Sequence, residues 1–207
     1  MQKKKDEAVL VVKRDILFKG ACVTGFKPLQ NFSSYQKIIN QHKDFLLRSD
    51  VEENTDYKQI IPYLIFCHQD KFFLMQRKSS ASEQRLRNKY SLGIGGHVRR
   101  EDVISDNIKD WILREFHEEI EYKGTLKIQP LGVINDDSNP VGQVHFGCVF
   151  LLEGSSETIN IKSELKQGIL ATVKECLAYR NSMEKWSQLI FDYLRKNLEE
   201  KEYYEKR

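Results

Sequence analysis

Residues 114–120 of this chain read Arg-Glu-Phe-His-Glu-Glu-Ile, and residues 92–97 read Leu-Gly-Ile-Gly-Gly-His. The first stretch places three glutamates, Glu115, Glu118 and Glu119, within five residues. On a helix, residues three and four positions apart are neighbours, so the three carboxylates share one edge. Like charges at this spacing destabilise a helix by about 0.2–0.5 kcal/mol per pair. The crowding therefore indicates that something positively charged lies between them.

The helix that carries these acids is predicted to begin near Asp102 or Ser105 and to run to about Glu121. At about 100° per residue the glutamates lie along one flank of an apolar stripe, beside Trp111. The stripe itself consists of Ile108, Ile112, Leu113, Phe116 and Ile120. The acids lie on this flank, they follow Arg114 directly, and a glycine pair precedes them in the sequence. Together these features favour a site for Mg²⁺ or Mn²⁺ rather than zinc. The alternative interpretation is a solvated acidic edge with ion pairs on the helix surface.

Length and composition narrow the classes of protein that this chain can belong to. The 207 residues suffice for one large domain, or for one domain with an extension. With 33 basic and 30 acidic residues the net charge is +3, which favours neither a nucleic-acid partner nor a membrane partner. The four cysteines form no C-x-x-C pair, so neither a zinc motif nor a redox motif is present, and a cytoplasmic setting is expected.

The pattern of apolar residues predicts strands mixed with helices. Near the N-terminus we expect strands at 8–13 and 15–18 and a helix over 33–48, followed by a hairpin of strands at 60–67 and 72–77. Further strands are expected at 90–94, 126–134 and 144–152, with helices within 165–179 and over 182–198. Such a mixture predicts an α/β (α+β) fold in which helices cover both faces of a mixed sheet.

Arg114-Glu115-Phe116-x-Glu118-Glu119 resembles the R-E-U-x-E-E core of the Nudix box, whose full pattern is G-x5-E-x7-R-E-U-x-E-E-x-G-U. Gly95-Gly96 resembles the opening of that box, and Phe72-Leu74-Gln76-Arg77 resembles the family's L-L-x-x-R strand. The resemblance covers about residues 58–198. It implies a Nudix-like α/β/α sandwich, with a hydrolase domain at 58–207 and an N-terminal extension at 1–57.

The chain departs from this pattern at three points. Gly96 precedes Arg114 by 18 residues, and we assign the four residues beyond the pattern to the loop 98–105. Counted back from Arg114, Asp106 stands at the position of the first glutamate of the box. Glu121 stands where the box has its last glycine. None of these changes affects the three glutamates or the arginine.

The resemblance implies metal-dependent hydrolysis of a diphosphate bond in a nucleoside diphosphate derivative, with Mg²⁺ or Mn²⁺ as cofactor. It also implies a catalytic set of Glu115, Arg114 and Glu118, in which Glu115 binds metal or, instead or in addition, helps to deprotonate the attacking water. Arg114 would hold the glutamates by charge-assisted hydrogen bonds. The implied metal ligands are three carboxylates and a backbone carbonyl: Glu115, Glu118, Glu119, and Gly95 or Gly96.

Outside the box, four side chains are candidates for contact with a nucleotide-type substrate: Arg77, Asp136, Asp137 and His145. The alternative for the two aspartates is a turn acid that satisfies its own backbone, and for His145 a hydrogen-bonded interior histidine. The extension and the altered box keep a second function open, a non-catalytic Nudix-fold module that binds or senses a nucleotide. A homodimer through the N-terminal strands is a further expectation.

Overall fold

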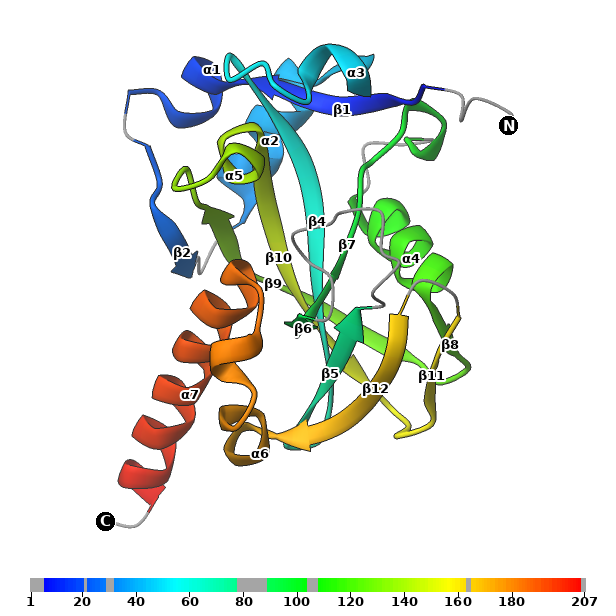
Figure 1. Cartoon of the computed structure of the whole chain (residues 1–207), viewed down its shortest axis with the longest axis vertical. Coiled ribbons are helices and arrows are strands. Elements are labelled where there is room, and N and C mark those ends of the chain that lie inside the picture. Colours follow the sequence, from blue (N-terminus) through cyan, green and yellow to red (C-terminus); the bar gives the residue numbers. More distant parts are fainter. Residues whose placement is uncertain are drawn as a thin grey trace. The chain divides into compact units, whose positions relative to one another are not determined.

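The computed structural model describes residues 6–20, 22–28, 32–77, 89–103, 108–162 and 165–205. The chain forms two compact units. The first comprises Met1–Tyr63, Gly95–Glu115 and Pro130–Phe150, and the second comprises Leu64–Ile94, Phe116–Gln129 and Leu151–Arg207. Strands and helices are intermixed along the chain, which confirms the mixed α/β class (Figure 1). The division at residue 57 stays a prediction.

In the first unit, strand β1 (Ala8–Lys13) is covered on both edges. It pairs antiparallel with β3 (Asp44–Leu47), and its end pairs with the start of β4 (Tyr57–His68). The run Val9–Val12 is buried, as expected for a strand that is apolar without alternation. Elsewhere in this unit β2 (Gly25–Pro28) pairs antiparallel with the end of β9 (Leu126–Asn135).

The short helices of the first unit differ from two predictions. The predicted strand at 15–18 is wrong, because α1 (Arg14–Phe18) occupies these residues. The predicted helix over 33–48 ends early, because α2 (Ser33–His42) stops at His42 and Asp44–Leu47 pairs with β1. Both errors fall on short apolar runs, which periodicity alone cannot assign to strand or helix. Other short helical elements of this unit are α3 (Arg48–Val51), the 3₁₀ turn η2 (Arg100–Asp102) and α5 (Pro140–Val144).

In the second unit, the predicted hairpin is confirmed. The end of β4 pairs with β5 (Lys71–Arg77) through Cys67↔Phe72 and His68↔Lys71. β5 also pairs antiparallel with β12 (Leu165–Thr172) from Lys71 to Arg77, and with the short β6 (Tyr90–Ser91) at Met75 and Gln76. A separate two-stranded sheet forms between β8 (Ile120–Tyr122) and β11 (Ile159–Ile161).

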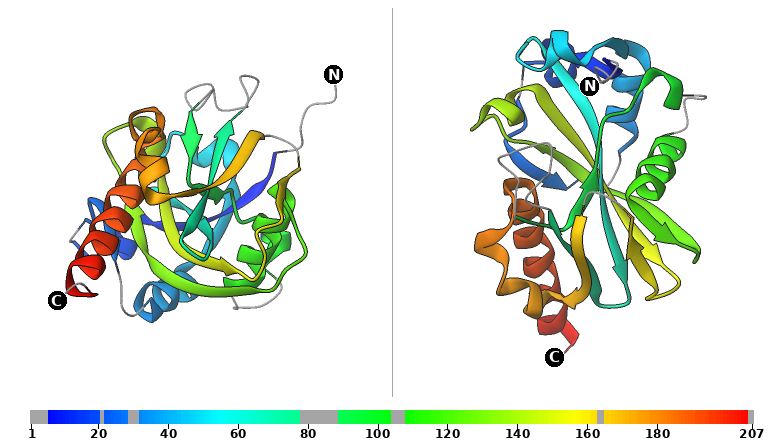
Figure 2. Two further views of the ribbon diagram at one scale, coloured as in Figure 1. Left: turned by 90° about the horizontal axis from the view of Figure 1, so that it is seen from below. Right: turned by 45° about the vertical axis from the view of Figure 1, so that its right-hand side comes forward.

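The C-terminal part of the second unit is only partly as predicted. The short helix expected within 165–179 is confirmed as α6 (Val173–Leu177), and Thr172 caps it by accepting a hydrogen bond from the Glu175 N–H. The strand before it, β12, which pairs with β5 along its length, was not predicted. The final helix, α7 (Lys185–Glu205), is confirmed, and Figure 2 shows α6, the turn η3 (Arg180–Ser182) and α7 following one another.

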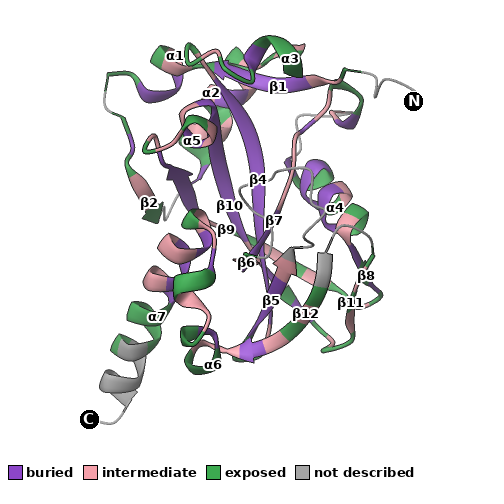
Figure 3. Cartoon of the chain, viewed as in Figure 1, coloured by how far each residue is buried: buried purple, intermediate pink, exposed green. Residues whose placement is uncertain are grey.

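The core follows the long strands. Residues of β4 and of β10 (His145–Gly154) are buried over most of their length, as Figure 3 shows. Helix α4 (Ile108–Glu119) buries Trp111, Ile112 and Phe116, but Leu113 of the predicted stripe is 37% exposed. Within the described part of the chain, no helix is both long and apolar enough to span a bilayer.

Candidate active site

Helix α4 carries the three glutamates at its C-terminal end. Glu115 is buried with 5% of its surface exposed, Glu119 is half-buried and Glu118 is exposed. The helix ends at Glu119, because Ile120 begins strand β8. Negative charge is unfavourable in the last turn of a helix, where the carbonyl ends of the peptide dipoles point outward. The acids are therefore at a position that helix stability alone does not favour.

Glu115 lies against the glycine turn that follows β7 (Gly93–Gly95). A Cβ atom added to Gly96 would be 2.3 Å from Glu115 Oε1 and 2.8 Å from Oε2. A Cβ atom added to Gly95 would instead be 2.9 Å from the carbonyl oxygen of Pro62 in β4. The two glycines thus have separate roles, since Gly95 allows close packing on β4 and Gly96 allows the carboxylate to reach the backbone.

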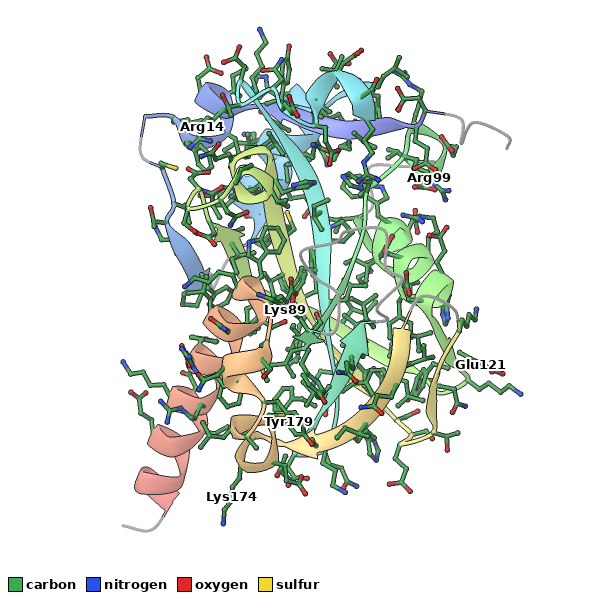
Figure 4. All side chains as sticks on the ribbon, viewed as in Figure 1. Arg14, Lys89, Arg99, Glu121, Lys174 and Tyr179 are labelled. Carbon is green, nitrogen blue, oxygen red and sulfur yellow. The ribbon has the colours of Figure 1, made fainter. Side chains whose placement is uncertain are left out.

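Arg114 connects Glu115 to the turn. Its Nη2 donates to Glu115 Oε2 at 2.9 Å and to the carbonyl oxygen of His97 at 3.0 Å. Its Nε forms an ion pair with Asp102 Oδ2 at 3.1 Å. Asp102 also accepts hydrogen bonds from the backbone N–H of Arg99 at 2.7 Å and from its Nη2 at 3.1 Å. We call Arg99, Asp102, Arg114 and Glu115 the Arg114 centre, and Figure 4 labels Arg99.

Asp102 is a residue that the sequence analysis missed. Asp106, which was aligned with the first glutamate of the box, lies outside the described residues. Asp102 follows Gly96 by six positions, the spacing that G-x5-E requires, and it contacts Arg114. Counting forward from Gly96 instead of back from Arg114 would have found it. On this count the four residues beyond the pattern fall between Asp102 and Arg114.

Asp136 and Asp137 begin the loop before α5 and have different partners. Asp136 accepts from the Ser138 N–H at 3.2 Å and from Asn139 Nδ2 at 3.4 Å, both within its own turn. Asp137 forms ion pairs with two cations, Arg14 of α1 and Lys58 of β4, the latter at 2.7 Å. We call Arg14, Lys58 and Asp137 the Asp137 centre. Arg14 is labelled in Figure 4.

The Asp137 centre also shifts the pKa values of its members. Burial alone would raise the pKa of Asp137, but the hydrogen bonds from Arg14 and Lys58 hold it well below its ordinary value. Burial lowers the pKa of Lys58, and the contact with Asp137 offsets part of this change. Lys58 is a second residue that sequence reasoning missed. The only signal was a lysine at the start of a long apolar strand.

His145 forms a hydrogen-bonded pair with His97. The two Nε2 atoms are 3.1 Å apart, and His145 Nδ1 lies 2.7 Å from the carbonyl oxygen of Val141. Because a carbonyl only accepts, His145 Nδ1 carries the proton, His145 Nε2 accepts and His97 Nε2 donates. Burial lowers the pKa of both imidazoles, which favours this neutral arrangement. His145 is thus a hydrogen-bonded interior histidine beside the glycine turn.

The last candidate for substrate contact is Arg77. Arg77 is the last residue of β5, and its side chain lies outside the part that the structure describes. Among the described residues, no group of three His, Cys, Asp or Glu side chains converges as a metal site would require. The glutamates of α4 therefore lie on one helix without already forming a closed set of ligands.

Comparison with known proteins places the chain in a family. No protein-family model matches it. It is 34% identical to the protein YmaB of Bacillus subtilis (strain 168) over 204 residues, which cover 92% of this chain and 98% of YmaB. Among solved structures it is similar to Tm1382, a protein assigned to the Nudix hydrolases, with a TM-score of 0.78 and 29% identity over 91% of this chain and 98% of that one.

The same architecture is present in a more distant structure. The Nudix domain of Shewanella oneidensis NrtR, solved in complex with ADP ribose, has a TM-score of 0.54 and 13% identity, and the match covers 68% of this chain and 88% of that chain. This likeness concerns the fold alone. Together with the box residues on α4, these similarities show that the chain belongs to the family of YmaB and to the Nudix hydrolase superfamily.

Proposed function

We propose that this protein is a metal-dependent hydrolase that cleaves the diphosphate bond of a nucleoside diphosphate derivative. The observation that supports this most directly is Glu115, a buried carboxylate that Arg114 holds against the backbone of Gly96. Burying a carboxylate is costly unless it is paired and hydrogen-bonded. A structural role would not require its second oxygen to face a glycine, whereas a cation site built from a carboxylate and a backbone carbonyl would.

The residues of α4 and the glycine turn suit a hard divalent cation. We propose that Glu115, Glu118 and Glu119 bind Mg²⁺ or Mn²⁺ together with a carbonyl oxygen of Gly95 or Gly96. Carboxylate and carbonyl oxygens are the ligands that these ions prefer. Because the described residues contain no closed group of ligands, binding would involve rotation of the long glutamate side chains.

In the proposed hydrolysis the cation and the side chains of the protein would have different roles. When bound, the cation would neutralise phosphate charge and lower the pKa of a water molecule. Arg114 would fix the orientation of Glu115 by the hydrogen bond to Oε2. Glu115 or Glu118 would accept the proton that the attacking water loses. The water oxygen bonds to phosphorus, the bond from phosphorus to the bridging oxygen breaks, and two phosphate-bearing products form.

The nucleotide would be bound mainly by loops outside the box. Arg77, Asp136, Asp137 and His145 remain our candidates for this side of the site. Asp137 and His145 bond to partners in their own surroundings, so we propose that they act through the shape of the loop. The complex of NrtR with ADP ribose supports a nucleotide-type ligand for this fold.

A panel of nucleotides tests the proposal. Purified protein is incubated with nucleoside triphosphates, dinucleoside polyphosphates and nucleotide sugars in Mg²⁺ or Mn²⁺, and products are separated by chromatography. We expect release of a monophosphate product from at least one compound, and loss of that activity in Glu118→Gln/Glu119→Gln. The matched control is Glu121→Gln, an exposed glutamate just beyond α4. Equal turnover by the double variant and the control would rule out the proposed ligands.

The second candidate function is a module that binds a nucleotide without hydrolysing it. The four residues beyond the pattern and Glu121 in place of the last glycine of the box favour it. Calorimetry separates the two functions. Binding of ADP ribose or another nucleotide without divalent metal, and without product after long incubation, would favour the binding module. Turnover that disappears with a chelator and returns with Mg²⁺ would favour the enzyme.

A further inference from the structure

Lys58 is a fully buried lysine to which the proposed reaction gives no role. It lies near the start of β4, and none of its surface is exposed. Its Nζ donates to Asp137 Oδ1 at 2.7 Å, to the carbonyl oxygen of Gly142 at 2.8 Å and to that of His145 at 3.3 Å. The three donor positions of the ammonium match these three acceptors. All three acceptors belong to one segment, residues 136–145, which we call the α5 loop.

The identity of these acceptors distinguishes the contact from a simple ion pair. Two of the three are backbone carbonyls, so the ammonium holds the path of the loop as well as one side chain. Burying an ammonium is costly, and an apolar side chain of similar volume often gives equal or greater stability. Stability alone therefore does not explain why a lysine occupies this position. A requirement for one particular loop conformation does.

The α5 loop follows a tight path that only a glycine permits at position 142. A Cβ atom added to Gly142 would lie 1.7 Å from the carbonyl oxygen of Asp136, so the chain folds back closely on itself there. Asn139 accepts from the Gly142 N–H at 3.0 Å and caps α5, a helix of five residues. The carbonyl oxygen of the same residue, Gly142, accepts a hydrogen bond from Lys58 Nζ.

A continuous set of hydrogen bonds connects this loop to Glu115 within the first unit. His145, whose carbonyl Lys58 contacts, accepts from His97 between ring nitrogens 3.1 Å apart. The carbonyl of His97 accepts from Arg114 Nη2 at 3.0 Å, and the same nitrogen donates to Glu115 at 2.9 Å. The position of the His145 ring thus affects the residue that follows Gly96.

We propose that Lys58 is a positioning residue of the site: it fixes the α5 loop so that His145 holds His97, and with it the glycine turn, against Arg114 and Glu115. The inference rests on the proposed function for its effect on catalysis. Arg14 assists from α1 by engaging the other side of Asp137. A segment of the N-terminal extension thereby contributes to the geometry of a site that the Nudix box alone does not determine.

The test separates positioning from stability. In Lys58→Met the apolar side chain of methionine fills the space of the lysine, but Asp137 keeps the ion pair with Arg14 alone. We expect a lower melting temperature and a lower kcat. In Lys58→Met/Asp137→Asn the partly buried charge is also removed, so we expect the melting temperature to recover in large part. The kcat should stay reduced by about tenfold or more, with a smaller change in KM, as for other residues that orient a metal site indirectly. Recovery of both quantities in the double variant would overturn the proposal.

A second measurement does not depend on hydrolysis. Nitrogen NMR of the histidine rings reports which nitrogen of each imidazole carries the proton. We expect the pattern of a protonated His145 Nδ1 and a protonated His97 Nε2 in the original protein, and its loss in Lys58→Met/Asp137→Asn. The control is Lys127→Met/Glu153→Gln, which removes an exposed ion pair of 3.3 Å. If no nucleotide is hydrolysed, the proposed function fails while this readout still tests the positioning role. Unchanged ring signals in the Lys58 double variant would refute that role.

Discussion

The two ion-pair centres of the first unit are built in opposite ways. In the Arg114 centre a guanidinium lies between two carboxylates, Asp102 and Glu115. In the Asp137 centre a carboxylate lies between two cations, Arg14 and Lys58. The first centre, with Arg99, has formal charges that balance, and the second has an excess of one positive charge. The difference indicates which centre can accept another cation.

Glu115 and Asp137 show this difference most clearly. Glu115 Oε2 accepts from Arg114, and Oε1 faces the backbone of Gly96. Both oxygens of Asp137 instead meet positively charged groups of the chain. A divalent cation would be attracted to the first carboxylate and repelled by the surroundings of the second. We therefore expect single substitutions in the Arg114 centre to affect activity more than stability. A single substitution that leaves a charge of the Asp137 centre unpaired should affect stability more than activity.

The largest expected effect is on catalysis, in Glu115→Gln. The amide retains the size of the side chain and an acceptor for Arg114, but loses the charge that would attract a cation. We expect kcat to fall about 10³-fold, equivalent to about 4 kcal/mol of activation free energy. The free energy of unfolding should change by less than about 1 kcal/mol. Steady-state kinetics and urea denaturation measure both, with Glu121→Gln as control. A large loss of stability with little loss of kcat would reverse our assignment of the centre.

The next largest effect is on stability, in Asp137→Asn. The variant leaves the buried Lys58 ammonium without a carboxylate, and breaking a buried pair in this way costs about 3 kcal/mol or more. Urea denaturation should show the loss, while kcat per folded molecule falls less than in Glu115→Gln. The exposed Glu153→Gln serves as control, since its pair with Lys127 lies at the surface. A change below about 1 kcal/mol would mean that Lys58 is held by its two carbonyl acceptors alone.

Local spacing in the sequence predicted two residues of the Arg114 centre, Arg114 and Glu115, and the glycine pair beside them, but not Arg99 or Asp102. Arg114, Glu115 and the glycine pair lie within 20 positions of one another along the chain, and one helix and one turn bring them together. The hairpin of β4 and β5 was predictable for the same reason, because its strands are joined by a turn of two residues. Such features depend on the backbone period of a helix or a strand, which the sequence displays directly.

The predictions failed where partners lie far apart in the sequence. Residues 44–47 are a strand because Leu46 pairs with Val9, and residues 165–172 are a strand because Ile169 pairs with Leu74. No local pattern reveals these partners. Lys58 was missed for the same reason, since its carboxylate partner is 79 residues away. Asp102 was missed for another reason. The four residues beyond the pattern lie between Asp102 and Arg114, so counting back from Arg114 leads to Asp106 instead.

A smaller effect is expected from Gly96→Ala, which tests the contact between the Arg114 centre and the backbone. The added Cβ would be 2.3 Å from Glu115 Oε1, so the carboxylate must rotate or the turn must move. A misplacement of about 1 Å at a reacting centre reduces rates by up to about 10²-fold, so we expect kcat to fall about 10- to 100-fold. Gly142→Ala is the matched change beside the Asp137 centre, and there we expect mainly a loss of stability. Equal kcat values for Gly96→Ala and the original protein would show that Glu115 does not need this approach.

The smallest expected effect is a dependence of stability on pH that belongs to Asp137. Its pKa in the folded protein lies well below the ordinary value of 3.8, because Arg14 and Lys58 outweigh the effect of burial. A lowered pKa means that the unfolded chain takes up the proton first, so this contribution is present above about pH 4 and is lost as the pH falls. One proton changes the free energy of unfolding by at most about 1.4 kcal/mol per pH unit. The gap in stability between the original protein and Asp137→Asn should therefore narrow between pH 4 and lower values. A gap that stays constant down to the acid transition would mean that the charge on Asp137 does not stabilise this centre.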